Sequence, residues 1–349
     1  MNNKRILAWA RPEILALKPY QSAREEFVGG DREMILLDAN ESPFENGMNR
    51  YPDPMQGKLK KRLAEAKNIS ENQIYLGNGS DEVLNQLMVS FCVPKKDKAV
   101  ILPPTFGMYK VCADINQIKT IKVPLTKNFE LDVESILKAQ TKTTKMVFIP
   151  SPNNPTGNCF NVNDIRKVVK NFDGFVVVDE AYVEFANEKS VLPWLSEFDN
   201  LIVVQTFSKA QGMAGVRLGM AFAHETVIEL LNKLKAPYNI NSLTQDAVLK
   251  RLKEQGLVTQ QVQQILQEKE RLLEELSNIT FIKKIYPSDA NFFLLKVDNS
   301  SIRYKELINR DIVVRNPSKQ IGCSNTLRIT VGTYEENNAL ISAFKTMEV

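Results

Sequence analysis

A short segment of the chain combines a lysine, hydroxyl side chains and an arginine at a spacing suited to chemistry on a phosphorylated aldehyde. Lys209 follows a hydrophobic run that ends at Gln205, with Thr206 and Ser208 just before it, and Arg217 stands eight residues later in a glycine-rich turn. Burial lowers the pKa of a lysine, so its neutral amine can form a Schiff base with an aldehyde. Arginine holds phosphate as a two-pronged, permanently charged donor. The segment indicates a cofactor with both groups, although a solvated lysine at a strand end would explain Lys209 taken alone.

Two other segments place polar side chains directly after hydrophobic runs. Asp179 and Tyr182 follow the apolar residues 174–178, and Asn154 lies in the proline-rich turn 151–157 after another such run. A buried carboxylate is costly unless it is paired with a cation, and a protonated pyridine nitrogen would be a suitable partner for Asp179. Asn154 and Tyr182 can hydrogen-bond an oxygen on the same ring. The alternatives are an aspartate that caps the next helix and a rigid turn without a ligand.

A glycine-rich turn and an aromatic residue complete the set. Gly79 is followed by Ser80 and Asp81, one of which is expected to cap the helix that begins there, and the free N–H groups of its first turn would face an anion. Phe106 follows a further apolar run and is suited to stacking on a flat ring. An ordinary capped helix and a core aromatic are the alternatives. All four of these segments follow strand-like runs, and each supplies a different contact to one molecule.

The elements that must position these residues alternate along the chain. Apolar β-rich runs alternate with helical stretches from about residue 75 to 225, which predicts a mainly parallel sheet covered by helices on both faces. Such sheets bind ligands at the carboxyl ends of their strands, where the polar residues fall. A long helical stretch and alternating segments follow Pro237 and predict a smaller α+β domain. The predicted strands are 99–102, 145–149, 174–178, 201–204 and 218–222 in the first part, and 291–297 and 326–331 in the second.

Composition and charge exclude several classes of function. The 45 Lys and Arg residues are interspersed with 41 Asp and Glu residues among 349, which disfavours a nucleic-acid-binding protein. The N-terminus lacks the apolar region of a signal peptide, and no apolar run reaches the roughly 18 residues of a membrane span, so a cytoplasmic protein is expected. The four cysteines form no C-x-x-C pair, which argues against a zinc site or a disulfide framework. They are Cys92, Cys112, Cys159 and Cys323.

The chain has a single histidine, His224. This disfavours histidine-based catalytic triads and multi-histidine metal sites, and no metal is expected. His224 follows a strand-like run, so we predict a surface position for it. Any proton transfer must use another side chain, and Lys209 is the candidate.

The combined motifs resemble those of the fold-type I pyridoxal-phosphate-dependent aminotransferases of class II. The resemblance covers nearly the whole chain, and the string from Leu17 to Arg24 favours the histidinol-phosphate branch of the family. It implies an α/β fold with a mainly parallel sheet flanked by helices and a second, smaller α+β domain. The large pyridoxal-phosphate-binding domain is expected at residues 31–269, and the discontinuous small domain at residues 1–30 and 270–349. Further matching strings are 37–42, 50–53 and 326–332.

The resemblance also implies roles for single residues. Lys209 carries the cofactor and, with Asp179 and Tyr182, forms the catalytic set, while Phe106 stacks on the ring where tyrosine is common in the family. Tyr51 reaches the cofactor phosphate of a neighbouring subunit, which implies a homodimer. The cofactor-binding residues are Gly79, Ser80, Asp81, Phe106, Asn154, Asp179, Tyr182, Thr206, Ser208, Lys209, Arg217 and Tyr51. The substrate-binding residues are Arg328 for the glutamate α-carboxylate, Arg315 and Tyr20 for the distal anion, and Asn40 nearby.

The implied reaction moves an amino group between L-glutamate and imidazole-acetol phosphate, giving histidinol phosphate and 2-oxoglutarate in histidine biosynthesis. The partners are then small molecules and a second subunit, without nucleic acid or membrane. One alternative is another pyridoxal-phosphate enzyme of the same fold, an aromatic aminotransferase or a threonine-phosphate decarboxylase. A non-catalytic binding module is the other, and the intact Lys209, Asp179 and Arg217 weigh against it.

Overall fold

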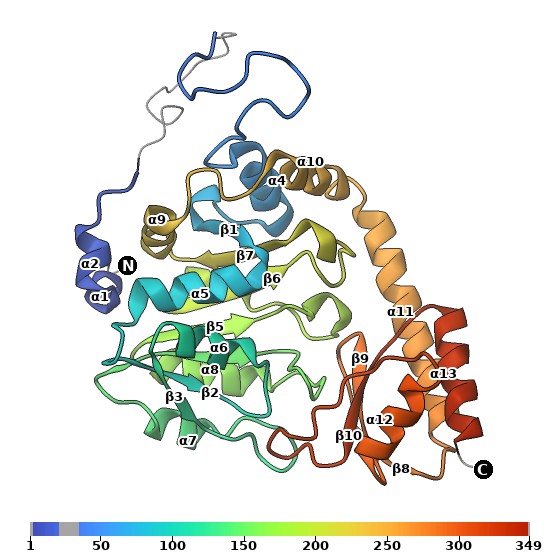
Figure 1. Cartoon of the computed structure of the whole chain (residues 1–349). Coiled ribbons are helices and arrows are strands. Elements are labelled where there is room, and N and C mark those ends of the chain that lie inside the picture. Colours follow the sequence, from blue (N-terminus) through green and yellow to red (C-terminus); the bar gives the residue numbers. More distant parts are fainter. Residues whose placement is uncertain (1–2, 21–34, 348–349) are drawn as a thin grey trace.

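A computed structural model describes residues 3–20 and 35–347 of the chain, and these contain two β-sheets (Figure 1). The strands of the larger sheet are β1 (Ile74–Asn78), β2 (Lys98–Ile101), β3 (Lys119–Lys122), β4 (Thr144–Pro150), β5 (Phe175–Asp179), β6 (Leu201–Thr206) and β7 (Leu218–Ala223). Their order in the sheet is β1-β7-β6-β5-β4-β2-β3. Strand β7 is antiparallel to both of its neighbours, β1 and β6, and the other pairs of adjacent strands are parallel.

Helices cover both faces of the larger sheet. They are α1 (Asn3–Trp9), α2 (Pro12–Ala16), α4 (Gly57–Lys67), α5 (Gly79–Phe91), α6 (Met108–Ile115), α7 (Val133–Lys138), α8 (Val162–Asn171), α9 (Glu225–Leu234) and α10 (Ser242–Arg251). The central strands β5 and β6 are buried at every residue, so both of their faces need apolar cover. Helices α1, α2, α5, α6 and α9 pack on one face, and α4, α7, α8 and α10 on the other.

The smaller sheet is antiparallel and lies at the C-terminal end of the chain (Figure 1). Its strands are β8 (Ile282–Ile285), β9 (Phe292–Val297) and β10 (Thr326–Thr330), in the order β10-β9-β8. The helices beside it are α11 (Gln255–Leu276), α12 (Ser300–Ile308) and α13 (Tyr334–Thr346). Apolar residues of β9, β10, α11 and α13 form its core.

Each sheet and the helices packed on it form one unit, and residues of helix α11 pack in both units. Its Val258 and Val262 pack with Phe185 and Ala210 of the larger unit. Its Leu272, near the other end of the helix, is fully buried in the core of the smaller sheet. The domain boundary predicted between residues 269 and 270 therefore falls inside one continuous helix.

The N-terminal helices pack on the larger sheet. Ile6 and Trp9 of α1 join the core on one of its faces, and the Trp9 ring meets Phe175 of β5 with ring centroids 5.0 Å apart. The prediction assigned residues 1–30 to the small domain, and the structure differs from it for α1 and α2. The apolar side of these helices fills a face of the sheet that would otherwise be exposed. The predicted boundary between residues 30 and 31 lies outside the described residues.

The strands predicted in both parts of the chain are present, and the larger sheet is mainly parallel as expected. The sequence did not single out β1, β3 or β8. Strand β3 is a short edge strand with lysines at both ends, so it lacks the apolar run that identifies a buried strand. Among the helices of residues 3–20 and 35–347, none is long and apolar enough to cross a membrane.

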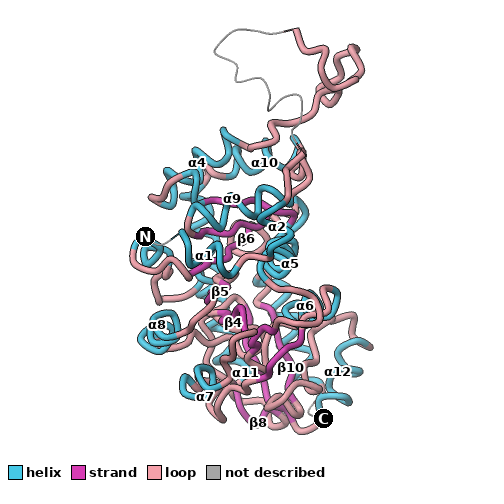
Figure 2. The backbone as a smooth tube through the Cα atoms, turned by 90° about the vertical axis from the view of Figure 1, so that its left-hand side faces the viewer, coloured by secondary structure: helices cyan, strands magenta, loops and turns pink. Residues whose placement is uncertain are grey.

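Residues 35–50 form a segment without helix or strand that stands away from the body of the molecule in both views, and we call it the N-terminal arm (Figures 1 and 2). It carries exposed apolar side chains, among them Ile35, Leu37 and Phe44, each more than 80% exposed. At its base, Arg50 pairs with Glu41 at 2.7 Å. The arm therefore presents apolar surface that the described part of this chain does not cover.

Candidate active site

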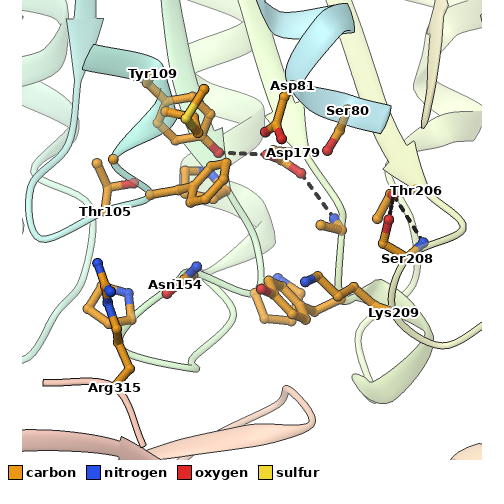
Figure 3. A pocket seen from close by; sticks show the side chains of 18 of the residues that line it. Ser80, Asp81, Thr105, Tyr109, Asn154, Asp179, Thr206, Ser208, Lys209 and Arg315 are labelled. Carbon is orange, nitrogen blue, oxygen red and sulfur yellow. Dashed lines mark hydrogen bonds between the residues drawn. The ribbon is translucent and has the colours of Figure 1, made fainter. Parts of the chain in front are cut away.

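A cavity of about 570 Å³ lies at the carboxyl ends of β4, β5 and β6, where parallel sheets place their ligands. Residues from the side of the smaller sheet, including Arg328 of β10, complete its wall, so the cavity lies between the two sheets. Figure 3 shows the side chains converging on this space. The predicted site residues that line it are Ser80, Asp81, Phe106, Asn154, Asp179, Tyr182, Thr206, Ser208, Lys209, Arg217, Arg315 and Arg328.

Asp179 ends strand β5 and is 5% exposed. Its Oδ2 accepts a hydrogen bond from the Tyr109 hydroxyl at 2.7 Å, and its Oδ1 accepts one from the Ala181 backbone N–H at 3.1 Å (Figure 3). Burial raises the pKa of Asp179 to about 6 even though both hydrogen bonds lower it. The carboxylate is therefore destabilised by desolvation and would gain from a cation placed in the cavity.

Lys209 points into the cavity from the turn after β6 (Figure 3). Its Nζ lies 5.5 Å from the centroid of the Tyr182 ring. Desolvation by the cavity walls, and next the positive charge of Arg328, lower the pKa of Lys209 below its ordinary value. The amine is thereby more available as the neutral nucleophile that the sequence predicted.

The first turn of α5 and Arg217 form a candidate anion site on the wall of the same cavity as Lys209, and we call it the anion cradle. Residue Asn78 precedes the helix and provides no side-chain cap, so the expected capping by Ser80 or Asp81 is wrong. Helix α5 starts at Gly79 instead, and Ser80 and Asp81 lie in its first turn, where N–H groups have no helical acceptor. Arg217 is 3.7 Å from the carboxylate of Asp81. These groups together suit a phosphate.

Two glycines allow the parts of this cradle to approach one another. Gly79 has φ +78, and a Cβ there would lie 2.5 Å from Nη2 of Arg217. A Cβ on Gly219 of β7 would overlap the backbone nitrogen of Ser80. Across the cradle, the Ser208 backbone N–H donates to the Thr206 hydroxyl at 3.1 Å. Gly79 was predicted to bind the cofactor, but it is not among the residues that line the cavity.

Gly219→Ala is expected to destabilise the protein by about 1–3 kcal/mol, the usual cost of overpacking, because the atom it would strike is backbone and cannot rotate away. Denaturant unfolding measures this change. Gly256→Ala is the matched control, since a Cβ on Gly256 in α11 meets nothing within 4 Å, and alanine favours a helix by about 1 kcal/mol over glycine. Equal effects of the two substitutions would contradict the close approach of β7 to α5.

Asn154 and Arg328 interact across the two units. Nη1 of Arg328 donates to Oδ1 of Asn154 at 2.5 Å, which leaves the Asn154 NH₂ group to donate elsewhere. The buried neighbour Asn153 holds the turn in place by donating to the Pro104 carbonyl at 3.0 Å. Nε of Arg328 is buried without a hydrogen-bond partner among the described residues. An unsatisfied guanidinium nitrogen of this kind fits a carboxylate ligand.

The second arginine of the cavity lies on the neighbouring backbone. Arg315 and Arg328 exchange backbone hydrogen bonds of 3.2 and 2.8 Å. The pKa of Arg328 is lowered, first by desolvation, and the charge of Arg315 contributes to this. In Figure 3, Arg315 and the pair Thr206 and Ser208 lie at opposite ends of the cavity. The site therefore offers an anion a place at each end.

Besides Gly79, three predicted residues lie outside the cavity. Tyr20 is 75% exposed, and Asn40 lies in the N-terminal arm with φ 56. Tyr51 is 49% exposed, and its ring stacks on Tyr238 with centroids 4.3 Å apart. A single copy of the chain does not bring these side chains to the other site residues.

Other residues of the site were not assigned from the sequence. Tyr109 hydrogen-bonds Asp179, and its position three residues after Phe106 in a helical stretch was the available signal. Gln320 accepts a hydrogen bond from the Thr105 backbone N–H at 3.1 Å and lines the cavity mouth. The predicted surface position of His224 is wrong: it is 6% exposed, and its Nδ1 accepts from the Thr226 N–H at the start of α9.

Residues 36–344 match the family of class I and II aminotransferases. The chain is 49% identical over 348 residues to a histidinol-phosphate aminotransferase of Christiangramia forsetii, covering 100% of this chain and 99% of that protein. Its fold is similar to the histidinol-phosphate aminotransferase from Clostridium acetobutylicum, with a TM-score of 0.80 and 25% identity over 86% of this chain and 91% of that one. The enzyme from Sinorhizobium meliloti, solved in complex with pyridoxal-5'-phosphate, is similar with a TM-score of 0.77 and 20% identity over 85% and 83% of the two chains. The family match spans both sheets and every residue that lines the cavity.

Proposed function

The chain belongs to the family of class I and II aminotransferases, and we propose that it is a histidinol-phosphate aminotransferase. The reaction transfers an amino group between L-glutamate and imidazole-acetol phosphate and yields histidinol phosphate and 2-oxoglutarate. The observation that carries this function is one cavity that combines a free lysine amine, a desolvated carboxylate, an anion cradle and two arginines. As part of the same proposal, the enzyme works in the cytoplasm on small, water-soluble substrates.

The cofactor is pyridoxal 5'-phosphate, and the residues of the cavity fit it. Desolvated Asp179 would meet the ring nitrogen, and the open first turn of α5 would meet the phosphate together with Arg217. When bound, the protonated pyridine ring accepts electrons from the substrate carbon that loses its proton. The remaining contacts proposed are Lys209 to the aldehyde carbon, Asn154 and Tyr182 to the ring oxygen, Phe106 to the ring face, and Gly79, Ser80, Asp81, Thr206 and Ser208 to the phosphate.

Lys209 also supplies the proton carrier. With pyridoxal phosphate bound, the Lys209 amine would be placed to take the proton from the substrate Cα and to deliver it to the former aldehyde carbon of the cofactor. The lowered pKa of Lys209 favours this neutral form. General base catalysis contributes roughly 10²–10⁴-fold to a rate. The only histidine of the chain, His224, lies in the N-cap position of α9 and does not line the cavity.

The substrate residues lie at the end of the cavity away from the cradle. Arg328 is proposed to hold the glutamate α-carboxylate, and its unpaired Nε supports this role. Arg315 is proposed to hold the distal anion, which is a carboxylate in glutamate and a phosphate in histidinol phosphate. Tyr20 and Asn40 would complete this region, although a single copy of the chain leaves them outside the cavity.

We also propose that the enzyme is a homodimer in which Tyr51 reaches the cofactor phosphate of the other subunit. The exposed apolar side chains of the N-terminal arm support a partner surface, because exposed apolar residues in such number gain from burial. The position of Tyr51 outside the cavity of its own chain supports a role in another copy.

Mixed dimers test this arrangement. Co-expressed Lys209→Ala and Tyr51→Ala chains should form dimers in which one site has both wild-type residues, so activity returns although each variant alone is impaired. Activity of mixed dimers no higher than that of the separate variants would contradict the shared site. Sedimentation of each variant alone is the control for dimer formation.

The substrate is tested by half-reactions with single amino donors. We expect histidinol phosphate to convert the bound cofactor to its amine form fastest, with glutamate as the second productive donor. Phenylalanine and threonine phosphate represent the two related enzymes. A faster conversion by phenylalanine, or release of carbon dioxide from threonine phosphate, would replace the proposed function with one of them.

A further inference from the structure

Tyr109 is a buried tyrosine that none of the roles above uses. It lies in the first turn of α6, is fully buried and lines the cavity. Its ring stacks on Phe148 of β4 with centroids 4.9 Å apart, and it meets the Phe106 ring edge-on at 5.7 Å. Its hydroxyl donates to Asp179 at 2.7 Å. Tyr109 therefore contacts both the proposed ring-stacking residue and the proposed partner of the ring nitrogen.

The hydrogen bonds of Asp179 fix the plane of its carboxylate. Tyr109 donates to one oxygen from α6, and the Ala181 N–H donates to the other from its own chain segment. A carboxylate accepts more than one hydrogen bond on each oxygen, so lone pairs remain for a ligand. Figure 3 shows Asp179 between Tyr109 and the open cavity.

We propose that Tyr109 is a positioning residue for the reaction: its hydroxyl holds Asp179 charged and oriented toward the cofactor ring nitrogen. This inference rests on the proposed function, since it assumes that pyridoxal phosphate occupies the cavity. Tyr109 suits the task because burial and the adjacent Asp179 raise the pKa of its own hydroxyl well above the ordinary value. It therefore remains a donor and does not become an anion next to Asp179.

The acidic groups near Asp179 disfavour its charged form, and the Tyr109 hydroxyl opposes their effect. Asp81 of α5 and Glu180, the next residue along the chain, are acidic and raise the pKa of Asp179, in addition to its desolvation. Lys209 and Tyr182 face the same cavity. Without Tyr109, the Ala181 N–H would be the remaining hydrogen bond that favours the carboxylate. Asp179 would then take up a proton at a higher pH and lose its attraction for a protonated ring nitrogen.

Tyr109→Phe removes the hydroxyl and keeps the ring that packs on Phe148 and Phe106. We expect it to weaken the binding of pyridoxal phosphate roughly tenfold to hundredfold, the range for a hydrogen bond to a charged group. The pH below which the protein loses its affinity for pyridoxal phosphate should rise. Equilibrium titration of the apoenzyme with cofactor at several pH values, followed by absorbance, measures the affinity and this pH limit. Tyr75→Phe is the matched control, because the Tyr75 hydroxyl is buried in the same core without a partner among the described residues.

A cofactor analogue with carbon in place of the ring nitrogen separates positioning from general packing. The analogue cannot pair with Asp179, so Tyr109→Phe should weaken its binding much less than that of pyridoxal phosphate. Equal losses for both compounds, an unchanged affinity in Tyr109→Phe, or an equal loss in Tyr75→Phe would overturn the inference. If the wild-type chain itself bound no pyridoxal phosphate, the proposed function would fail instead, whatever Tyr109 does.

Discussion

Lys209→Ala is expected to lower the rate of amino transfer by more than the roughly 10²–10⁴-fold that a general base contributes. The substitution would remove both functions proposed for Lys209, the covalent attachment of the cofactor and the transfer of the proton. No other lysine lines the cavity among the described residues, so none is placed to substitute for it. Single-turnover half-reactions with histidinol phosphate measure the loss.

The covalent role of Lys209 has its own readout. Borohydride reduction of the holoenzyme followed by mass spectrometry should find the cofactor on the peptide that contains Lys209, and on no lysine in Lys209→Ala. Lys60→Met is the matched control, because burial lowers the pKa of Lys60 to about 8 but the residue does not line the cavity. A Lys209→Ala enzyme that kept the wild-type rate and the covalent cofactor would refute the assignment.

Asp179→Asn is the second substitution with a large expected effect. Asparagine has nearly the same shape but no charge, so it cannot stabilise a protonated ring nitrogen. We expect the amino-transfer rate to fall by roughly 10²–10³-fold, as when one preorganised electrostatic group is removed from a site. The half-reaction rate and the affinity for the cofactor both report this. Glu180→Gln is the control, since Glu180 is also buried but accepts hydrogen bonds from Ser190, Gln205 and Val191 outside the cavity.

Asp179→Asn should lower the amino-transfer rate, but it should not lower the stability of the apoenzyme. Burial raises the pKa of Asp179 from 3.8 to about 6. The unfolded chain therefore ionises at a lower pH than the folded one, and the stability of the folded state falls as pH rises between these values. Above pH 6 the folded protein carries the full free-energy cost of burying the charged Asp179 carboxylate. Asp179→Asn removes this cost. Thermal unfolding of the apoenzyme should show the variant at least as stable as the wild type at pH 7, with the difference shrinking as pH falls toward 4. A variant markedly less stable at pH 7 would contradict this account.

The sequence predicted the main parts of the site because its residues directly follow apolar strands. Asp179 and Thr206 end β5 and β6, and Lys209 follows in the next turn, so parallel strand ends bring them together. Arg328 could be assigned only by resemblance, because its place in the cavity depends on how the smaller sheet packs against the larger one. No local pattern encodes that packing.

Other features depend on contacts between residues far apart in the chain. Tyr109 received no role from the sequence, and its hydrogen bond to Asp179 joins residues 70 positions apart. The antiparallel direction of β7 follows from the short connection after β6, which the apolar pattern of β7 does not reveal. The N-terminal helices were assigned to the wrong unit because an amphipathic helix does not specify which apolar surface it covers. The roles of Tyr20 and Tyr51 stay predictions, because neither side chain lines the cavity of its own chain.

Helix α11 has a consequence for how the molecule unfolds. Its 22 residues span about 33 Å at the rise of an α-helix. One end completes the packing around Ala210, next to Lys209, and the other end completes the core of the smaller sheet. Melting either core removes a packing surface of the other, so the two units are expected to lose structure in a single cooperative transition. The surroundings of Lys209 and those of Arg315 and Arg328 are then expected to be lost in the same transition.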